Sequence, residues 1–212
     1  MAMDKDERFT QLVEQAQTCH RCPRMEGRRR VLSRANGNLH ASVLFIAEAP
    51  GRLGGDRCGI PLSQDQTGRN FTLLLQAAGL AREEIFITNA VLCNPRDEDG
   101  HNAPPTMREL HNCSCHLLQT LDILSPRTIV TLGRVALKAL RLIAPHSIEL
   151  ARDVGKAMVW NGYQLIPLYH PGPRAQLHRP FETQMEDFRQ MGKLIGKGNT
   201  PAQQAGGFPD GL

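Results

Sequence analysis

The chain has 212 residues, with 25 Lys or Arg against 21 Asp or Glu, which gives a formal net charge of +4. A chain of this length can bury a hydrophobic core as one domain. It contains no apolar run near the ~18 residues that a membrane-spanning helix requires, and residues 1–20 lack the apolar stretch of a signal peptide. We therefore expect a cytoplasmic protein without membrane contact. The mild basic charge is compatible with a polyanionic partner.

The cysteine content and the C-terminal composition add two further expectations. Six cysteines in a cytoplasmic chain indicate metal binding or thiol chemistry in preference to disulfides. Residues 196–212 are rich in Gly, Pro and Gln, which predicts a disordered tail. Residues 1–195 show no internal repeat or boundary, so we expect a single domain and a monomeric protein.

Amphipathic segments with helical spacing alternate along the chain with short, continuous apolar runs that are typical of buried strands. Helices are expected over residues 6–18, 70–78, 106–124, 134–143 and 182–195, and strands over residues 43–47, 85–88, 128–132, 157–160 and 163–169. Thr106 and Glu109 form a capping box, and Asn161-Gly162 predicts a type I′ turn between the last two strands. The alternation predicts an α/β fold with three layers, α/β/α, around a central, mainly parallel four-stranded sheet.

Polar segments follow directly on three strands of this predicted sheet. Residues 48–51 (Glu-Ala-Pro-Gly) follow the first strand, Asn89 ends the second, and residues 170–173 (His-Pro-Gly-Pro) follow the last. Ligands of parallel sheets bind beyond the carboxyl ends of the strands. We therefore expect one cleft that collects a carboxylate, an amide and an imidazole and that could bind a planar heterocycle. Residues 52–68 and 94–105 form long polar loops, which are usually functional.

Several cysteines have the spacing of ligands to one metal centre. The candidates are Cys19, Cys22, Cys93 and Cys113, with Cys115 and His116 as alternatives for the fourth position. Cys19 and Cys22 form a C-x-x-C pair, a spacing that lets two thiolates converge on one centre. Four such ligands suit zinc or a [4Fe–4S] cluster, and the spacing leaves that choice open. Cys58 is expected to be a free thiol.

The motifs, taken in order, resemble the uracil-DNA glycosylase superfamily, and most closely its family 4 iron–sulfur enzymes. Residues 48–51 resemble the first family motif, Gly-Glu-x-Pro-Gly, and residues 87–93 (Ile-Thr-Asn-Ala-Val-Leu-Cys) resemble its strand-end motif with a following cysteine. Residues 109–133 resemble the family's helix and third strand, and residues 170–171 (His-Pro) resemble its last motif. The similarity extends over residues 19–195.

The resemblance implies a cofactor, a [4Fe–4S] cluster, and a partner, DNA that contains uracil or another deaminated base. The implied ligands are Cys19, Cys22, Cys93 and Cys113. Counted back from Pro126, Cys113 falls at the family's fourth ligand position and Cys115 does not. The cluster is expected to hold the N-terminal arm and the loop after Cys93, without a redox role.

The site residues acquire roles from the same resemblance. Asn89 offers a donor and an acceptor to the edge of uracil, and His170 is expected to donate a hydrogen bond to the uracil O2 as negative charge develops there. Glu48 is the first choice, and Asp56 the second, for the carboxylate that positions water and balances the cationic sugar. Glu48 could instead be purely structural. The further substrate-binding candidates are Gly51, Leu62, Ser63 and Arg174.

These features predict a monofunctional base excision repair enzyme that flips uracil out of DNA and hydrolyses its N-glycosidic bond, leaving an abasic site. The chain departs from the family pattern at several positions. Ala47 replaces a glycine, Asp56 is the only carboxylate left where an acidic pair is usual, the Cys93–Cys113 interval is longer, and Leu62 stands where a phenylalanine stacks on uracil. Phe71 is a possible substitute but is expected in the core. Alternatives are a glycosylase for hypoxanthine or xanthine, a non-catalytic metal-stapled DNA-binding module, and a zinc protein.

Overall fold

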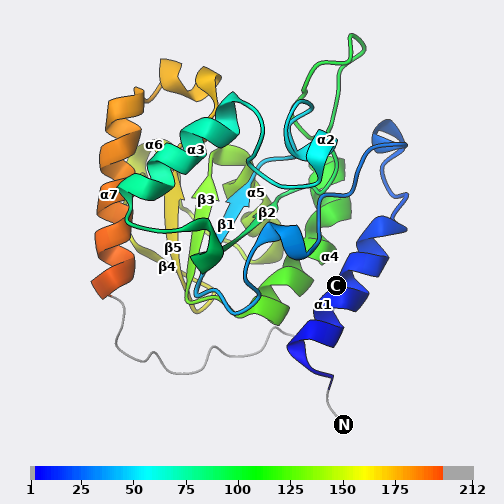
Figure 1. The fold of residues 1–212 in the computed structure, drawn as a ribbon, viewed down its shortest axis with the longest axis horizontal. Helices are drawn as coiled ribbons and strands as arrows, with labels where there is room; N and C mark the ends of the chain where they lie inside the picture. The colour runs from blue at the N-terminus through cyan, green and yellow to red at the C-terminus, as the bar shows by residue number, and fades with distance from the viewer. Residues whose placement is uncertain (1–2, 198–212) are drawn as a thin grey trace.

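The computed structural model describes residues 3–197, which form one sheet with helices on both faces (Figure 1). The strands are β1 (Val43–Ala47), β2 (Ile85–Asn89), β3 (Thr128–Leu132), β4 (Met158–Trp160) and β5 (Tyr163–Leu168), in the order β2-β1-β3-β5-β4. All neighbours are parallel except β4 and β5. The predicted α/β/α fold is confirmed, but the sheet has five strands where four were expected. The extra strand is β4, because the first arm of the predicted hairpin also joins the sheet.

Helices occupy most of the remaining chain. They are α1 (Lys5–Gln17), α2 (Gly55–Cys58), α3 (Gln66–Ala77), α4 (Met107–Leu124), α5 (Arg134–Ile143), α6 (Leu150–Asp153) and α7 (Phe181–Lys197), with 3₁₀ turns η1 (Pro23–Met25), η2 (Arg34–Asn36), η3 (Arg82–Glu84) and η4 (Pro173–Leu177). The capping box of Thr106 and Glu109 opens α4 as predicted. The loop predicted over residues 52–68 is shorter, because it contains α2 and the first turn of α3. The tail predicted over residues 196–212 lies outside the described residues, except that residues 196–197 belong to α7.

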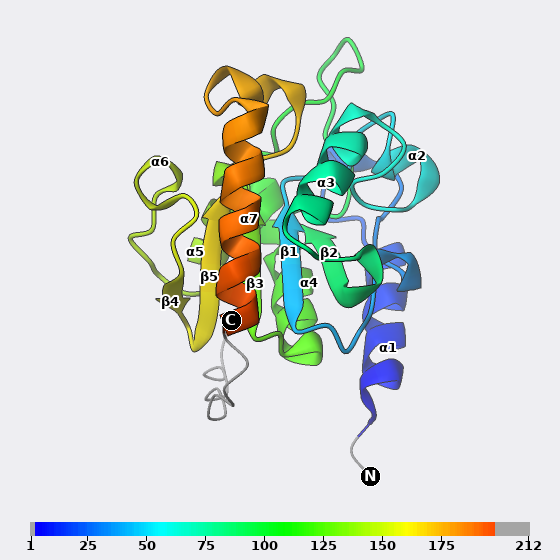
Figure 2. The same ribbon diagram turned by 60° about the vertical axis from the view of Figure 1, so that its left-hand side comes forward.

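Side chains alternate between the two faces of the sheet and fill two separate cores. On β1, Leu44 and Ile46 face the core formed with α1, α4 and α5. Val43 and Phe45 point the opposite way, into the core formed with α3 and α7. Figure 2 shows α3 and α7 in front of the strands, with α4 and α5 behind them. All five residues of β1 are buried. This confirms that its continuous apolar run indicates a central parallel strand.

A close contact between α3 and α7 fixes the orientation of α3. A side chain at Gly192 would collide with the backbone of Ala78, so only glycine allows the two helices to approach this closely. The opposite end of α3 then lies beside the loop after β5, where the Asn70 Nδ2 donates to the Pro171 carbonyl at 2.7 Å. The packing of α3 therefore brings its first turn to the edge of the sheet that carries the polar motifs.

Candidate active site and metal centre

Glu48, Asn89 and His170 all lie at the carboxyl edge of the sheet. Ala47 pairs directly with Asn89 in the parallel register of β1 and β2, so Glu48 begins the adjacent loop. β5 runs parallel to β3 in the same sheet, and His170 follows it by two residues. Gly133, which follows β3, lies so close that a Cβ there would be 3.5 Å from the His170 Cβ. The sheet thus gathers the three predicted residues as the topology required, and their roles stay predictions.

Asn89 is a buried amide with an unused donor. Its exposed fraction is 2%, and its Nδ2 has no hydrogen-bond partner among residues 3–197. An unsatisfied buried donor costs about 1–3 kcal/mol. A side chain that carries this cost at a strand end is suited to a ligand that supplies the missing acceptor.

His170 is held as a neutral imidazole with one defined tautomer. Its Nδ1 accepts the Gly172 N–H at 3.0 Å, which leaves the proton on Nε2. Burial lowers the pKa of His170 to about 4, although the nearby Asp65 carboxylate acts in the opposite direction. At neutral pH the ring therefore presents a neutral N–H donor, fixed by its own loop.

The two predicted carboxylates have different surroundings. Glu48 is half-buried, and burial raises the pKa of its carboxyl group. Asp56, on α2, has both oxygens occupied: Oδ2 pairs with Arg96 at 2.7 Å and Oδ1 accepts the Arg29 N–H at 3.2 Å. Asp56 therefore joins the N-terminal arm to the loop after β2, an arrangement that favours a structural role.

A third carboxylate, Asp65, lies near this edge and has no motif in the sequence that marks it. It is the N-cap of α3, and its Oδ1 accepts the Gly68 N–H at 2.8 Å. Its Oδ2 lies against the loop after β1, because a Cβ at Gly51 or at Gly54 would be 2.9 or 2.6 Å from it. The available signal was an aspartate before a helix, but α3 was expected to begin at residue 70, so the cap went unrecognised.

The loop that contains Leu62, the residue expected at the stacking position, has an unusual backbone. Leu62 and Gln64 have positive φ angles of 49° and 60°, a backbone conformation that residues other than glycine rarely adopt. Between them, the Ser63 hydroxyl donates to the Ile60 carbonyl at 3.0 Å. Phe71 cannot replace the missing ring, because it is fully buried and packs edge-on against Phe45.

Two surface residues, Arg174 and Leu177, lie on η4, directly after the His170 motif. Arg174 is one of the predicted substrate-binding residues. Arg174 is exposed, and Leu177 is 85% exposed, an unusual degree of exposure for a leucine. The Arg174 side chain has no hydrogen bond or ion pair in the part of the chain that the structure describes. Both side chains are therefore accessible to a partner.

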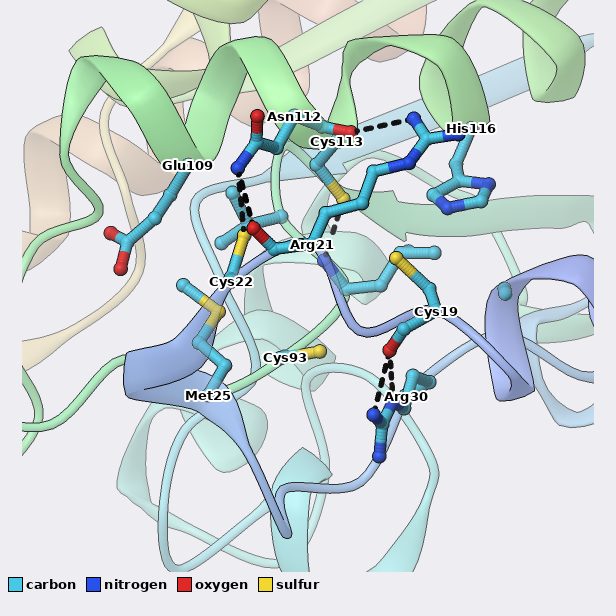
Figure 3. Close-up of a pocket in the computed structure, with 13 residues that line it drawn as sticks. Cys19, Arg21, Cys22, Met25, Arg30, Cys93, Glu109, Asn112, Cys113 and His116 are labelled. Atoms are coloured by element: carbon cyan, nitrogen blue, oxygen red, sulfur yellow. Dashed lines mark hydrogen bonds between the residues drawn. The ribbon is translucent and has the colours of Figure 1, made fainter.

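A cavity separate from this edge contains the four predicted cysteine ligands (Figure 3). Its lining includes Cys19, Cys22, Cys93, Cys113 and His116. Cys115 does not line the cavity, and its Sγ accepts a hydrogen bond from Arg21 at 2.8 Å instead. Cys58 lies elsewhere, 3.2 Å from the Ser63 hydroxyl. The structure thus brings together the four cysteines that were chosen from the sequence.

The chemistry of the cavity fits a cationic metal centre. Burial raises the pKa of Cys93 to about 11 and that of Cys113 further, so their thiolates require a cation to form. Backbone and side-chain donors already point at sulfur, with Leu92 N–H 3.4 Å from the Cys113 Sγ and Asn112 Nδ2 3.4 Å from the Cys22 Sγ. Such N–H···S contacts accompany cluster thiolates.

His116 adds a polar group to the same lining. Its exposed fraction is 5%, and neither ring nitrogen has a hydrogen-bond partner among the described residues. An imidazole left unpaired next to four sulfurs suits a cavity that receives a polar group. This residue was considered from the sequence only as an alternative ligand.

The fold defines a doubly wound α/β protein, with the candidate site at the carboxyl edge of its sheet, where ligands of such sheets bind. Residues 35–191 match the family model of the uracil DNA glycosylase superfamily, and the chain belongs to that superfamily. This confirms the resemblance inferred from the motifs.

Relatives of the chain are similar over most of their length. A type-4 uracil-DNA glycosylase of Archaeoglobus fulgidus is 30% identical over 199 residues, covering 90% of this chain and 95% of the relative. One from Saccharolobus solfataricus is 32% identical, covering 87% and 85%. A type-5 uracil-DNA glycosylase of Pyrobaculum aerophilum is 26% identical, covering 78% and 83%. Separately, no helix within residues 3–197 has the length and apolar character needed to cross a membrane.

Proposed function

We propose that the chain is a monofunctional uracil-DNA glycosylase of base excision repair, which hydrolyses the N-glycosidic bond and leaves an abasic site. The observation that carries the proposal is the pair of Asn89 and His170 at one sheet edge: a buried amide with an unused donor, and a neutral imidazole with its proton on Nε2. Membership of the superfamily and the names of the relatives support the choice of uracil.

Each residue of the pair has a distinct task in this mechanism. Asn89 binds the edge of the flipped base, because one amide supplies both a donor and an acceptor. The Nε2–H of His170 donates to the uracil O2, where negative charge accumulates as the glycosidic bond breaks. A neutral donor is suited to this task, because the ring does not need to be protonated first. Glu48, in the adjacent loop, balances positive charge on the sugar.

DNA contacts are assigned to the rim of the site. Gly51, Ser63 and Arg174 are candidates for phosphate contacts, through backbone amides and the guanidinium. Leu177, which is exposed on η4 like Arg174, is suited to fill the gap that the flipped base leaves. The protein is expected to act on DNA as a monomer in the cytoplasm.

The proposed cofactor is a [4Fe–4S] cluster bound by Cys19, Cys22, Cys93 and Cys113, with zinc as the alternative. When bound, it would cross-link the N-terminal arm, the segment after β2 and helix α4 through metal–thiolate bonds. The convergence of the four cysteines on one cavity and the N–H···S contacts support a metal centre, and the type-4 relatives favour iron–sulfur. Purified protein that absorbs near roughly 400 nm and contains iron would exclude zinc alone.

A second candidate function changes only the base. Leu62 provides no aromatic face for uracil, and Phe71 is in the core, so the site could accept hypoxanthine or xanthine. A panel of oligonucleotides, each with one of these bases or uracil, separates the two functions when free base and alkali-dependent strand cleavage are measured. Release of uracil above the other bases supports the first function, whereas DNA binding without any released base supports a non-catalytic module.

A further inference from the structure

Asp65 lies between the two loops that form the candidate active site. On one side, its Oδ2 contacts the loop after β1, close to Gly51 and Gly54. On the other side, the first turn of α3 adjoins the His170 loop: a Cβ at Gly172 would be 3.4 Å from the Thr67 Oγ1. Asp65 therefore faces the same edge of the sheet as Glu48 and His170.

Only one of the two carboxylate oxygens of Asp65 has a hydrogen-bond partner. Its Oδ1 is held by the Gly68 N–H at 2.8 Å, while its Oδ2 has no hydrogen-bond or ion-pair partner among the described residues. Asp56 differs, because Arg96 and the Arg29 N–H occupy both of its oxygens. The position of Asp65 at the N-terminus of a twelve-residue helix also favours a negative charge. One fixed oxygen and one free oxygen are the arrangement that a general base needs.

Charge interactions agree with this placement. Burial lowers the pKa of His170, and the Asp65 carboxylate is the group that counteracts it. Burial acts differently on Glu48, where it raises the pKa of the carboxyl group. The two carboxyl groups thus differ in environment, which is how acid–base roles are commonly divided within a site.

We propose that Asp65 is the catalytic carboxylate that accepts the proton of the attacking water, an inference that rests on the proposed function. As the C1′–N1 bond of the deoxyuridine breaks, its electron pair leaves with the uracil, whose O2 is held by the His170 Nε2–H. The water oxygen bonds to C1′, and the water's proton passes to the Asp65 Oδ2. The products are an abasic sugar with a C1′ hydroxyl, a uracil anion and a protonated Asp65, which returns its proton to the uracil or to solvent.

The test uses substitutions that keep the helix cap but remove the charge. Asp65→Asn and Asp65→Ser both retain an N-cap oxygen, and Asp65→Glu retains the carboxylate. Asp4→Asn is the matched control, because Asp4 is the N-cap of α1, which contributes no residue to the candidate site, and its side chain accepts the Glu7 N–H. Single-turnover release of uracil from a single-stranded oligonucleotide is measured across pH, together with affinity for an oligonucleotide carrying a non-cleavable 2′-fluoro-deoxyuridine.

The expected result is a loss in rate without a loss in binding. Asp65→Asn and Asp65→Ser should lower the single-turnover rate about 100-fold, while Asp65→Glu recovers at least about tenfold. Affinity for the analogue should change by less than about threefold, and Asp4→Asn should match the wild type.

Several results would overturn the inference. These are a wild-type rate in Asp65→Asn, a loss of affinity that accounts for the whole effect, or failure of both capped variants to fold, which would make Asp65 a structural residue. The proposed function fails in a different way: in that case the wild-type protein itself releases no uracil.

Discussion

At the scale of single residues, burial and the absence of partners distinguish the candidate site from the rest of the sheet edge. Asn89 is 2% exposed with an unpaired donor, and the ring of His170 is fixed by one backbone hydrogen bond. Asp56 has the opposite character, since its partners are already in place. Groups with unmet hydrogen-bonding capacity are the ones available to a substrate.

Replacing Asn89 should separate base binding from stability. Asn89→Ala removes an unpaired donor, so the variant should fold at least as well as the wild type while the rate of uracil release falls about 100- to 1000-fold. Asn38→Ala, which removes an exposed turn asparagine that accepts the His40 N–H, is the control. Thermal melting and single-turnover kinetics measure the two quantities. Wild-type activity in Asn89→Ala would exclude the assigned role.

His170 should make stability depend on pH in a defined window. Its pKa falls from 6.5 when unfolded to about 4 when folded, because burial disfavours the charged ring. Within that window the unfolded state binds more protons, so the free energy of unfolding decreases as the pH falls from 6.5 towards 4. His170→Gln should flatten this part of the profile, as followed by melting temperature. Identical slopes in the two proteins would contradict the neutral imidazole in the folded state.

At the scale of elements, the parallel strands place the motifs and the helices supply what lies around them. The ends of β1, β2 and β5 were predictable, because parallel strands bring their carboxyl ends to one edge. Asp65 was not predictable, because a polar sequence concealed the start of α3 and the contact with Gly54 joins residues from two different loops. The orientation of His116 towards the cysteines likewise depends on how α4 packs, which its sequence spacing alone does not specify.

The metal centre should connect three elements and stabilise them together. Cys113→Ser should lose most of the iron, about four atoms per chain in a complete cluster, and should expose the segment between α1 and β1 to proteolysis. Cys58→Ser and Cys115→Ser are matched controls, because neither side chain lines the cavity. Iron content and limited proteolysis are the measurements. Full iron content in Cys113→Ser, with loss in Cys115→Ser, would assign the fourth ligand to Cys115.

At the scale of the whole molecule, the candidate metal centre and the candidate catalytic groups occupy different regions. The cavity of the four cysteines lies by α4 and the N-terminal arm, whereas the candidate catalytic groups lie at the strand ends and the start of α3. Asp56 and Arg96 connect the two regions through an ion pair. Loss of metal should therefore impair DNA binding and stability before it affects the bond-breaking step itself.

The most direct measurement is the detection of free uracil by mass spectrometry after iron-loaded protein is incubated with a uracil-containing single-stranded oligonucleotide. The account predicts free uracil and an intact strand that breaks only after alkali treatment, with both lost in Asn89→Ala. Binding of the oligonucleotide without any released base, by protein with a full complement of iron, would contradict the central claim.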